Sequence, residues 1–228
     1  MSKTVVIHQP DFMPYLGFFH RLLYAEIFVI LDNVQFLRRG WHHRDKIKIN
    51  SGEKWLTIGV KKASQNTAIK EIILNEDNWK EQHINLIKQN YKKAEYFTDI
   101  FPYIEKLYNK ESNTMIDFNI ASIEMLLELF DINIQKQFAS KYKIKTVANE
   151  LLVDILQATN ATHYLSGIGA KDYFVSEPFE KANIEVIWQN FKHPIYPQLH
   201  GEFIPYLSSI DLLFNCGIEK SREILRSI

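Results

Sequence analysis

The sequence predicts an α/β fold: a mostly parallel sheet with a Rossmann-like strand–helix–strand start and a helical insert. Short apolar runs alternate with helical patterns near both ends of the chain, as in proteins with parallel sheets. One run, from Ile27, stays apolar up to Asp32, which is typical of a strand covered on both faces. We therefore expect one α/β domain over residues 1–228, with residues 78–131 as a helical insert or subdomain within it.

The first expected strand, residues 5–7, leads into a loop that two prolines make stiff. Pro10 and Pro14 fix two φ angles and remove two backbone donors, so neither a longer strand nor an immediate helix fits there. A helix is expected from Gly17, because the next apolar residues recur at helical spacing. Ligands of open α/β sheets bind at such strand-to-helix junctions. This junction carries His8, Gln9, Tyr15 and His20.

The second strand, expected over residues 27–36, carries polar side chains past its apolar part. Asp32, Asn33 and Gln35 are expected near His8, because neighbouring parallel strands end at the same edge of a sheet. A basic and aromatic run follows directly, and it contains Arg38, Arg39, Trp41, His42, His43, Arg44 and Lys46. Arginine binds phosphate or carboxylate bidentately, and tryptophan covers planar or sugar faces. The alternative interpretation is a solvated, mobile basic loop.

The middle of the chain predicts structure rather than chemistry. Strands are expected over residues 54–61, after the turn signal N-S-G, and over residues 69–74. Asn78 and Glu81 have the spacing of a capping box, which predicts the start of the helical region. Its apolar stripes are assigned to the core. The lysine-rich residues 141–145 are expected to form a solvated edge strand.

The α/β alternation resumes after the helical region. A helix is expected over residues 150–159, followed by a strand through Tyr164 and Leu165. A small-residue loop then spans residues 166–169, and a helix is expected from Ala170. Glycines in this loop let backbone N–H groups approach a ligand, and the helix start favours an anion.

A second two-proline loop follows a further strand, expected over residues 185–191. The loop carries His193, Tyr196, Gln198 and His200, which resembles the composition of the first loop. A last apolar helix is expected over residues 210–214, with Gly217 ending it. In a mostly parallel sheet these strand-end loops would share one edge, so a single cleft is the simplest interpretation.

Composition excludes several function classes. Lysine plus arginine equals aspartate plus glutamate at 27 each, so no global field attracts nucleic acid or an acidic membrane. A single cysteine, Cys216, excludes an internal disulfide. Neither a secretory signal pattern nor an apolar run of ~20 residues is present, which predicts a cytoplasmic protein without membrane insertion.

Metal binding is a weaker interpretation. His8, His20, Asp32, His42 and His43 supply enough nitrogen and oxygen atoms for a metal ion. No pair of them has the i, i+4 spacing of a helical zinc motif, and we expect no metal site. The sequence identifies neither a cofactor nor an oligomeric state.

Several long motifs resemble the WbqC-like protein family. They are I-H-Q-P-D-F-M-P-Y-L-G-F-F-H, F-V-I-L-D-N-V-Q-F, R-R-G-W-H-H-R-D-K-I, Y-L-S-G-I-G-A-K-D-Y-F and H-P-I-Y-P-Q-L-H-G-E-F-I-P-Y-L-S-S-I-D-L-L-F-N-C-G. The resemblance covers nearly the whole chain. It implies a bacterial context of O-antigen and other surface-glycan biosynthesis, and it does not supply the reaction.

The resulting hypothesis is a transferase that acts on a nucleotide-activated sugar or a related donor, a small phosphate-bearing substrate. His8 or His20 would serve as general base, with Asp32 orienting the base or the substrate. Arginines of the basic run would hold phosphate, and Trp41 or Tyr15 would cover a ring. The candidate substrate-binding residues are Gln9, Tyr15, Asn33, Gln35, Arg38, Arg39, Trp41, Arg44, Ser166, Gly167, Gly169, His193, Tyr196 and Gln198.

Two alternatives stay open. The first is a nucleotidyltransferase-like or adenylyltransferase-like enzyme, because the strand–loop–helix start is distantly similar to enzymes of the pantothenate synthetase type. The chain departs from that group because it lacks H-x-G-H. The second is a non-catalytic, sugar-nucleotide-binding accessory protein for a glycosyltransferase, which needs the arginines and aromatic residues but no titratable histidine.

Overall fold

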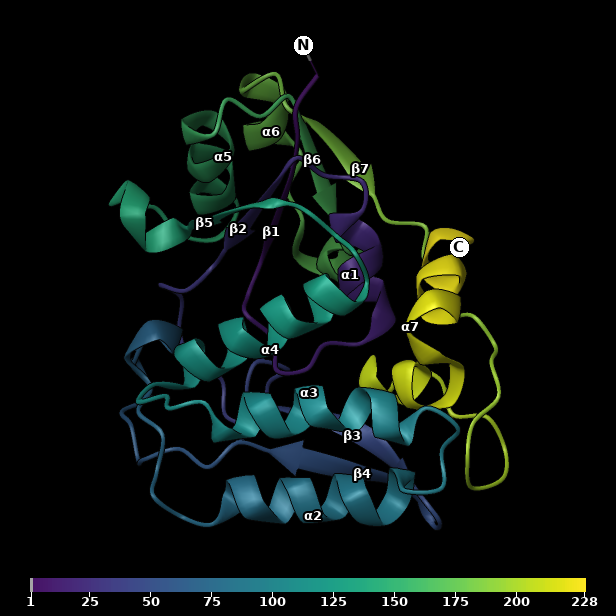
Figure 1. Cartoon of the computed structure of the whole chain (residues 1–228). Helices are drawn as coiled ribbons and strands as arrows, with labels where there is room; N and C mark the ends of the chain where they lie inside the picture. The colour runs from purple at the N-terminus through teal and green to yellow at the C-terminus, as the bar shows by residue number, and fades with distance from the viewer. Residues whose placement is uncertain (1) are drawn as a thin grey trace.

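A computed structural model describes residues 2–228, and a five-stranded parallel sheet is its framework (Figure 1). The strand order is β5-β2-β1-β6-β7. The strands are β1 (Thr4–His8), β2 (Ile27–Ile30), β5 (Gln135–Phe138), β6 (His163–Ser166) and β7 (Glu185–Trp188). Every neighbouring pair is parallel, so the prediction of an α/β fold with a mostly parallel sheet is confirmed.

The direction in which the sheet grows reverses beside β1. From β1 the chain adds β2 and then β5 on one side, and it later adds β6 and β7 on the other side. The connections after β1 and β6 therefore lead away from one another at the carboxyl ends of these strands. This is the topological switch point, where open α/β sheets bind ligands.

Apolar side chains cover both faces of the sheet. On β1, Val5 and Ile7 belong to a cluster with helices α5 (Ala148–Ala158) and α6 (Glu177–Lys181). Val6 points into a larger cluster on the opposite face. Continuous apolar runs in β1 and β2 follow from this two-sided burial.

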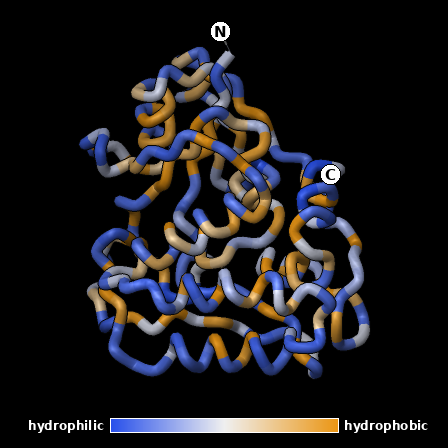
Figure 2. The backbone as a smooth tube through the Cα atoms, in the orientation of Figure 1, coloured by the Kyte–Doolittle hydropathy of each residue, from blue (hydrophilic) through white to orange (hydrophobic). Residues whose placement is uncertain are grey.

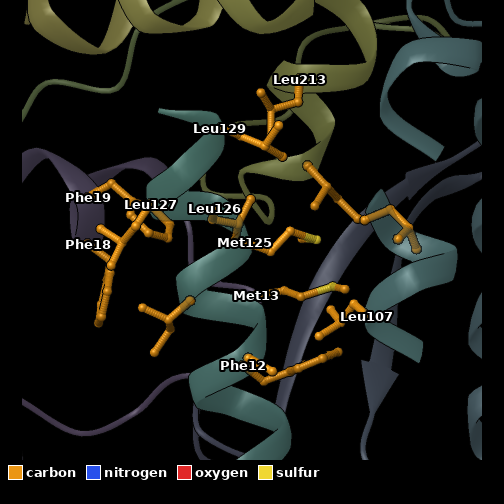
Figure 3. Close-up of a cluster of buried hydrophobic side chains, with 14 of the residues drawn as sticks. Phe12, Met13, Phe18, Phe19, Leu107, Met125, Leu126, Leu127, Leu129 and Leu213 are labelled. Carbon is orange, nitrogen blue, oxygen red and sulfur yellow. The ribbon is translucent and has the colours of Figure 1, made fainter. Parts of the chain in front are cut away.

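The larger cluster joins the sheet to α1 (Leu16–Leu22), α4 (Met115–Leu129) and α7 (Ile210–Arg226). It also extends to α2 (Trp79–Tyr91) and α3 (Phe97–Asn109). Figure 3 shows Phe12 and Met13, from the loop after β1, among side chains of α3, α4 and α7. Both loop residues are fully buried, so the loop after β1 is packed into the core.

The remaining layer is a hairpin covered by two helices. Strands β3 (Arg44–Ile49) and β4 (Gly52–Thr57) pair antiparallel, and α2 (Trp79–Tyr91) and α3 (Phe97–Asn109) lie beside them (Figure 1). Most of α2 is coloured hydrophilic in Figure 2, with short hydrophobic stretches between. The buried residues of α2 recur every four positions, as on one face of a helix. No helix within residues 2–228 combines the length and the apolar character that a membrane span needs.

The predicted second strand is too long. It ends at Ile30, because its partner β1 stops at His8 and Pro10 then supplies no N–H group for the ladder. The basic run is not wholly a loop, since β3 begins at Arg44. Its lysines hid the alternation that places Asp45 and Ile47 inside.

Three short segments also differ from their predictions. Residues 69–74 hold a 3-10 helix, Ile69–Glu71, rather than a strand. The edge strand was predicted over residues 141–145, but the strand at this edge of the sheet is β5, earlier in the chain. The lysine-rich segment instead begins in the 3-10 helix Ala139–Tyr142. The element after Gly167 is a 3-10 helix, Ile168–Tyr173.

Two helix ends differ as well. The Asn78 side chain accepts no backbone hydrogen bond, so the predicted capping box does not form and α2 begins at Trp79 without it. Gly217 ends only the first part of α7. Its φ of 74° turns the backbone there, and a second helical stretch continues to Arg226.

Candidate functional site

The candidate site lies where β1 and β6 end, on either side of the switch point. His8 is the last residue of β1, and Ser166 is the last residue of β6. The loop after β1 adds Asp11, and α1 adds Arg21. Segments more than 140 residues apart in the sequence thus meet at one edge of the sheet.

His8 is held by its own loop. Its Nδ1 atom lies 2.9 Å from the carbonyl oxygen of Gln9 and 3.5 Å from the Asp11 carboxylate. With the ring proton on Nδ1, that nitrogen donates to the carbonyl, and Nε2 carries the free lone pair. Burial and, to a smaller extent, the positive charge of Arg21 lower the pKa of His8 to about 3, so the ring is neutral near pH 7.

Asp11 is a buried carboxyl group poised near neutral pH. Only 7% of the residue is exposed. Burial raises its pKa to about 7, although the nearby Arg21 charge acts in the opposite direction. A group half-ionised at neutral pH is suited to accept and to return a proton. Asp11 lies within the motif I-H-Q-P-D-F-M-P, and it is not among the predicted site residues.

The basic loop docks on the first loop. His42 Nδ1 lies 2.9 Å from Gln9 Oε1, and the backbone N–H of Phe12 donates to the carbonyl of Trp41 at 3.0 Å. Asn119 of α4 is fully buried, and its amide donates to the carbonyls of Pro10 and His42 at 2.8 and 2.7 Å. The structure therefore brings the two segments together.

His20 is engaged at both ring nitrogens. Nδ1 lies 3.0 Å from Gln189 Nε2, and Nε2 lies 3.4 Å from the backbone oxygen of Ile228. The same Gln189 amide donates to the carbonyl of Gly17 at 2.8 Å. His20 thus fastens α1 to the end of β7, and neither nitrogen is free to act as a base.

Asp32 has a structural partner. Its two oxygens accept hydrogen bonds from the Ser140 backbone at 2.9 Å and from the Ser140 hydroxyl at 2.6 Å. These bonds join the ends of β2 and β5 and turn Asp32 away from a role at His8. Gln35 donates to the carbonyl of Gln65, and the Asn33 side-chain oxygen is buried without a partner in the described chain.

The exposed end of the basic loop forms an aromatic and cationic surface. Trp41 is half exposed, and its ring centroid lies 5.6 Å from that of Trp55. The Arg44 guanidinium stacks 3.8 Å above the Trp55 ring, and Arg44 Nε donates to the carbonyl of Arg39. Arg38 and Arg39 are exposed. This surface adjoins the first loop through the Phe12–Trp41 hydrogen bond.

The second two-proline loop reaches the first through aromatic rings. The His193 ring lies 5.1 Å from Tyr206, and Tyr206 lies 6.1 Å from Tyr15. Tyr196 and Gln198 instead bind the buried Asp211, away from the strand ends.

After β6, the Ser166 hydroxyl is buried at 3.4 Å from that of Tyr164, whereas Gly169 is exposed. Arg21 was missed by the prediction, although a charged residue amid the apolar residues of a short buried helix is the signal that marks it. It is 5% exposed and lies against Gly167.

Two further observations bound the site. A cavity of about 480 Å³ lies elsewhere, between α4 and β5, and none of the predicted site residues lines it. Within residues 2–228 no three histidine, cysteine, aspartate or glutamate side chains are grouped so that they could hold a metal ion.

Comparisons with known proteins identify the family. The model of the WbqC-like protein family matches residues 9–223. An uncharacterized protein of Mycobacterium tuberculosis (strain ATCC 25618 / H37Rv), Rv1507c, is 29% identical over 220 residues, which cover 95% of each chain. No solved structure matches the chain. Since the family model spans most of the sequence, the chain belongs to the WbqC-like protein family.

Proposed function

We propose that this protein is a transferase of bacterial surface-polysaccharide biosynthesis that acts on a nucleotide-activated sugar or a related phosphate-bearing donor. The observation that supports catalysis best is the pair of Asp11 and His8 at the switch point. A buried carboxyl group with a pKa of about 7 lies 3.5 Å from an imidazole that stays neutral. The surface-glycan context comes from the family resemblance.

Each side chain has a separate role in the proposed reaction. Ionised Asp11 takes the proton of the acceptor's hydroxyl or amine as that atom attacks the donor, and the leaving group departs with the bonding electron pair. His8 accepts a hydrogen bond at Nε2 and orients the acceptor. The proposal gives proton transfer to Asp11 rather than to His20 or Asp32, because both of these are engaged elsewhere.

Donor binding is assigned to the surface beside this pair. Arg38, Arg39 and Arg44 would contact phosphate, and Trp41 would cover a base or a sugar ring. The contact between Trp41 and the first loop supports this assignment, since it fixes the aromatic surface relative to Asp11.

The test is a turnover assay with sugar nucleotides as donors, in which the released nucleotide is measured. We expect Asp11→Asn to lower kcat by about 10²- to 10⁴-fold with donor affinity nearly unchanged. For the wild type, kcat/KM is expected to rise with pH through about 7, as Asp11 ionises, and Asp11→Asn should lose this dependence. Asp131→Asn, at an exposed carboxylate, is the matched control.

The alternatives predict different results. Release of pyrophosphate from a nucleoside triphosphate would favour a nucleotidyltransferase. Donor binding without turnover, unaffected by Asp11→Asn, would contradict the proposal and favour an accessory protein.

A further inference from the structure

We propose that Arg21, held against Gly167 at the switch point, is a built binding site for a phosphoryl group of the substrate. That the anion is a phosphoryl group rests on the proposed function; that it is an anion follows from the geometry. The site is distinct from the exposed arginines of the basic loop, because it lies inside the fold between the ends of β1 and β6.

Arg21 is buried without a partner. The residue is 5% exposed, yet within residues 2–228 its guanidinium makes no hydrogen bond and has no carboxylate within 4 Å. Its Nε atom is fully enclosed and unbonded. Charged side chains are almost never buried unless something pairs with them. A guanidinium in this state lacks an acceptor, and the acceptor it suits best is a planar or tetrahedral oxyanion bound by two N–H groups.

Gly167 shows that the position of the guanidinium is built in. A Cβ atom on residue 167 would lie 2.8 Å from Arg21 Nη1 and 3.4 Å from its Cζ. The backbone of Gly167 has φ −73° and ψ 147°, which any residue adopts, so conformational freedom does not explain this glycine. The glycine is explained by the space that the guanidinium needs, which a side chain on residue 167 would fill. Gly167, after β6, and Arg21, in α1, therefore form one site from two segments that are distant in the sequence.

The surroundings place the anion beside the proposed chemistry. The charge of Arg21 acts on Asp11, His8 and Tyr15, and also on Tyr164 in β6. A phosphoryl group bound to Arg21 would therefore act electrostatically on the carboxyl group that moves the proton. Both ring nitrogens of His20, the neighbouring residue, are bonded, which fixes α1 and hence the direction in which Arg21 extends.

The test is calorimetric titration of the whole protein with inorganic phosphate and pyrophosphate at constant ionic strength. Wild type is expected to bind at least one of the two anions, and Arg21→Gln to bind it roughly tenfold more weakly or worse. Arg222→Gln removes the same charge from a half-buried position on α7, where Arg222 pairs with Glu219 and donates to the carbonyl of Leu129, and it should bind as the wild type does.

Gly167→Ala keeps every charge and displaces only the flexible end of the Arg21 side chain, so the variant should fold. It should bind pyrophosphate more weakly than the wild type does. This variant serves if Arg21→Gln does not fold. Equal affinity in wild type and Arg21→Gln, or no binding of either anion by wild type, would overturn the site.

Asp11→Asn separates this site from the proposed function. The variant should retain pyrophosphate binding. Weaker pyrophosphate binding in Arg21→Gln together with no turnover by the wild type would refute the transferase assignment and leave the anion site standing, whereas full turnover in Asp11→Asn would refute only the role of Asp11 as the base.

Discussion

Two buried polar clusters in this protein differ in whether their charged side chains have hydrogen-bond partners. Around Asp211, which is fully buried, the carboxylate accepts hydrogen bonds from Tyr91 at 2.7 Å, Tyr196 at 3.0 Å and Gln198 at 2.8 Å. Lys48, also fully buried, donates to Gln198 and to backbone carbonyls of the loop that follows it. At the switch point, and within residues 2–228, the buried Nε of Arg21 has no acceptor, and the Asp11 carboxyl group makes no hydrogen bond to a cationic side chain.

The contrast separates structure from function. A buried charge whose bonds are complete stabilises the fold and specifies one arrangement of the chain. A buried charge whose bonds are incomplete lowers the free energy of unfolding, and it persists where a ligand completes them. The Asp211 cluster fixes the second two-proline loop to α7. The Arg21 guanidinium instead has an unused N–H donor for the anion proposed above. Four predictions test this contrast.

The largest effect is expected for Asp211→Ala. Three donors would lose their acceptor inside the protein, and Lys48 would lose a nearby negative charge, so unfolding free energy should fall by about 3–5 kcal/mol. Urea denaturation monitored by circular dichroism measures this. A loss below about 1 kcal/mol would contradict the structural role of the cluster.

The next effect depends on pH and concerns Asp11→Asn. The pKa of an ordinary aspartate is 3.8, and burial raises that of Asp11 to about 7 in the folded protein, so folding favours the protonated carboxyl group. Its contribution is full below pH 4 and is lost as pH rises to 7. The asparagine of Asp11→Asn does not ionise, so the variant does not lose stability in this way as pH rises. The stability of Asp11→Asn relative to wild type should therefore increase between pH 4 and pH 8, by at most about 4 kcal/mol.

Thermal unfolding of both proteins at several pH values measures this difference. Asp131→Asn should show no comparable trend, because that carboxylate is exposed. A flat difference for Asp11→Asn would mean that Asp11 is not a strained carboxyl group.

A smaller loss is expected for Lys48→Met. Methionine fills a similar volume, but Gln198 and the carbonyl of Glu202 lose their donor, which should cost about 1–3 kcal/mol. The loop over residues 192–206 should also become more susceptible to proteolysis. Unchanged stability and cleavage would show that the lysine is dispensable.

The smallest effect is expected for Arg21→Gln in the absence of ligand. Because the guanidinium has no bond to lose, stability should change by no more than about 1 kcal/mol, and removal of an unpaired charge can raise it. Measured in the presence of pyrophosphate, wild type should gain stability and Arg21→Gln should not. A large loss of stability in Arg21→Gln without ligand would show that Arg21, like Asp211, has a structural role.

The sequence predicted the parallel sheet well, because β1, β2 and β6 are apolar runs bounded by turn residues. It failed where polar side chains hide a strand. β5 is Q-K-Q-F at the sheet edge, and in β3 two lysines alternate with the inward positions Asp45 and Ile47. Edge and hairpin strands depend on pairing with distant segments, which no local pattern reveals.

The predicted site residues stay a prediction, and the structure shows which of them lie together. The convergence of His8, Gln9 and the basic loop follows from strand order. The engagement of His20 by Gln189, and of Asp32 by Ser140, depends on contacts between distant parts of the chain. Arg21 and Asp11 were missed for the same reason: what distinguishes them is burial without a partner, a property of the folded chain.

The amide of Asn119 has a consequence for how this protein can be divided. It ties Pro10 to His42 from the middle of α4, a helix that begins more than a hundred residues after β1. The strand-end loop thus takes its shape from the helical block as well as from the sheet. A fragment that carries only the sheet would keep His8 and Arg21 in its sequence but lose the support that arranges them. Recombination between relatives would therefore have to pass on both parts together.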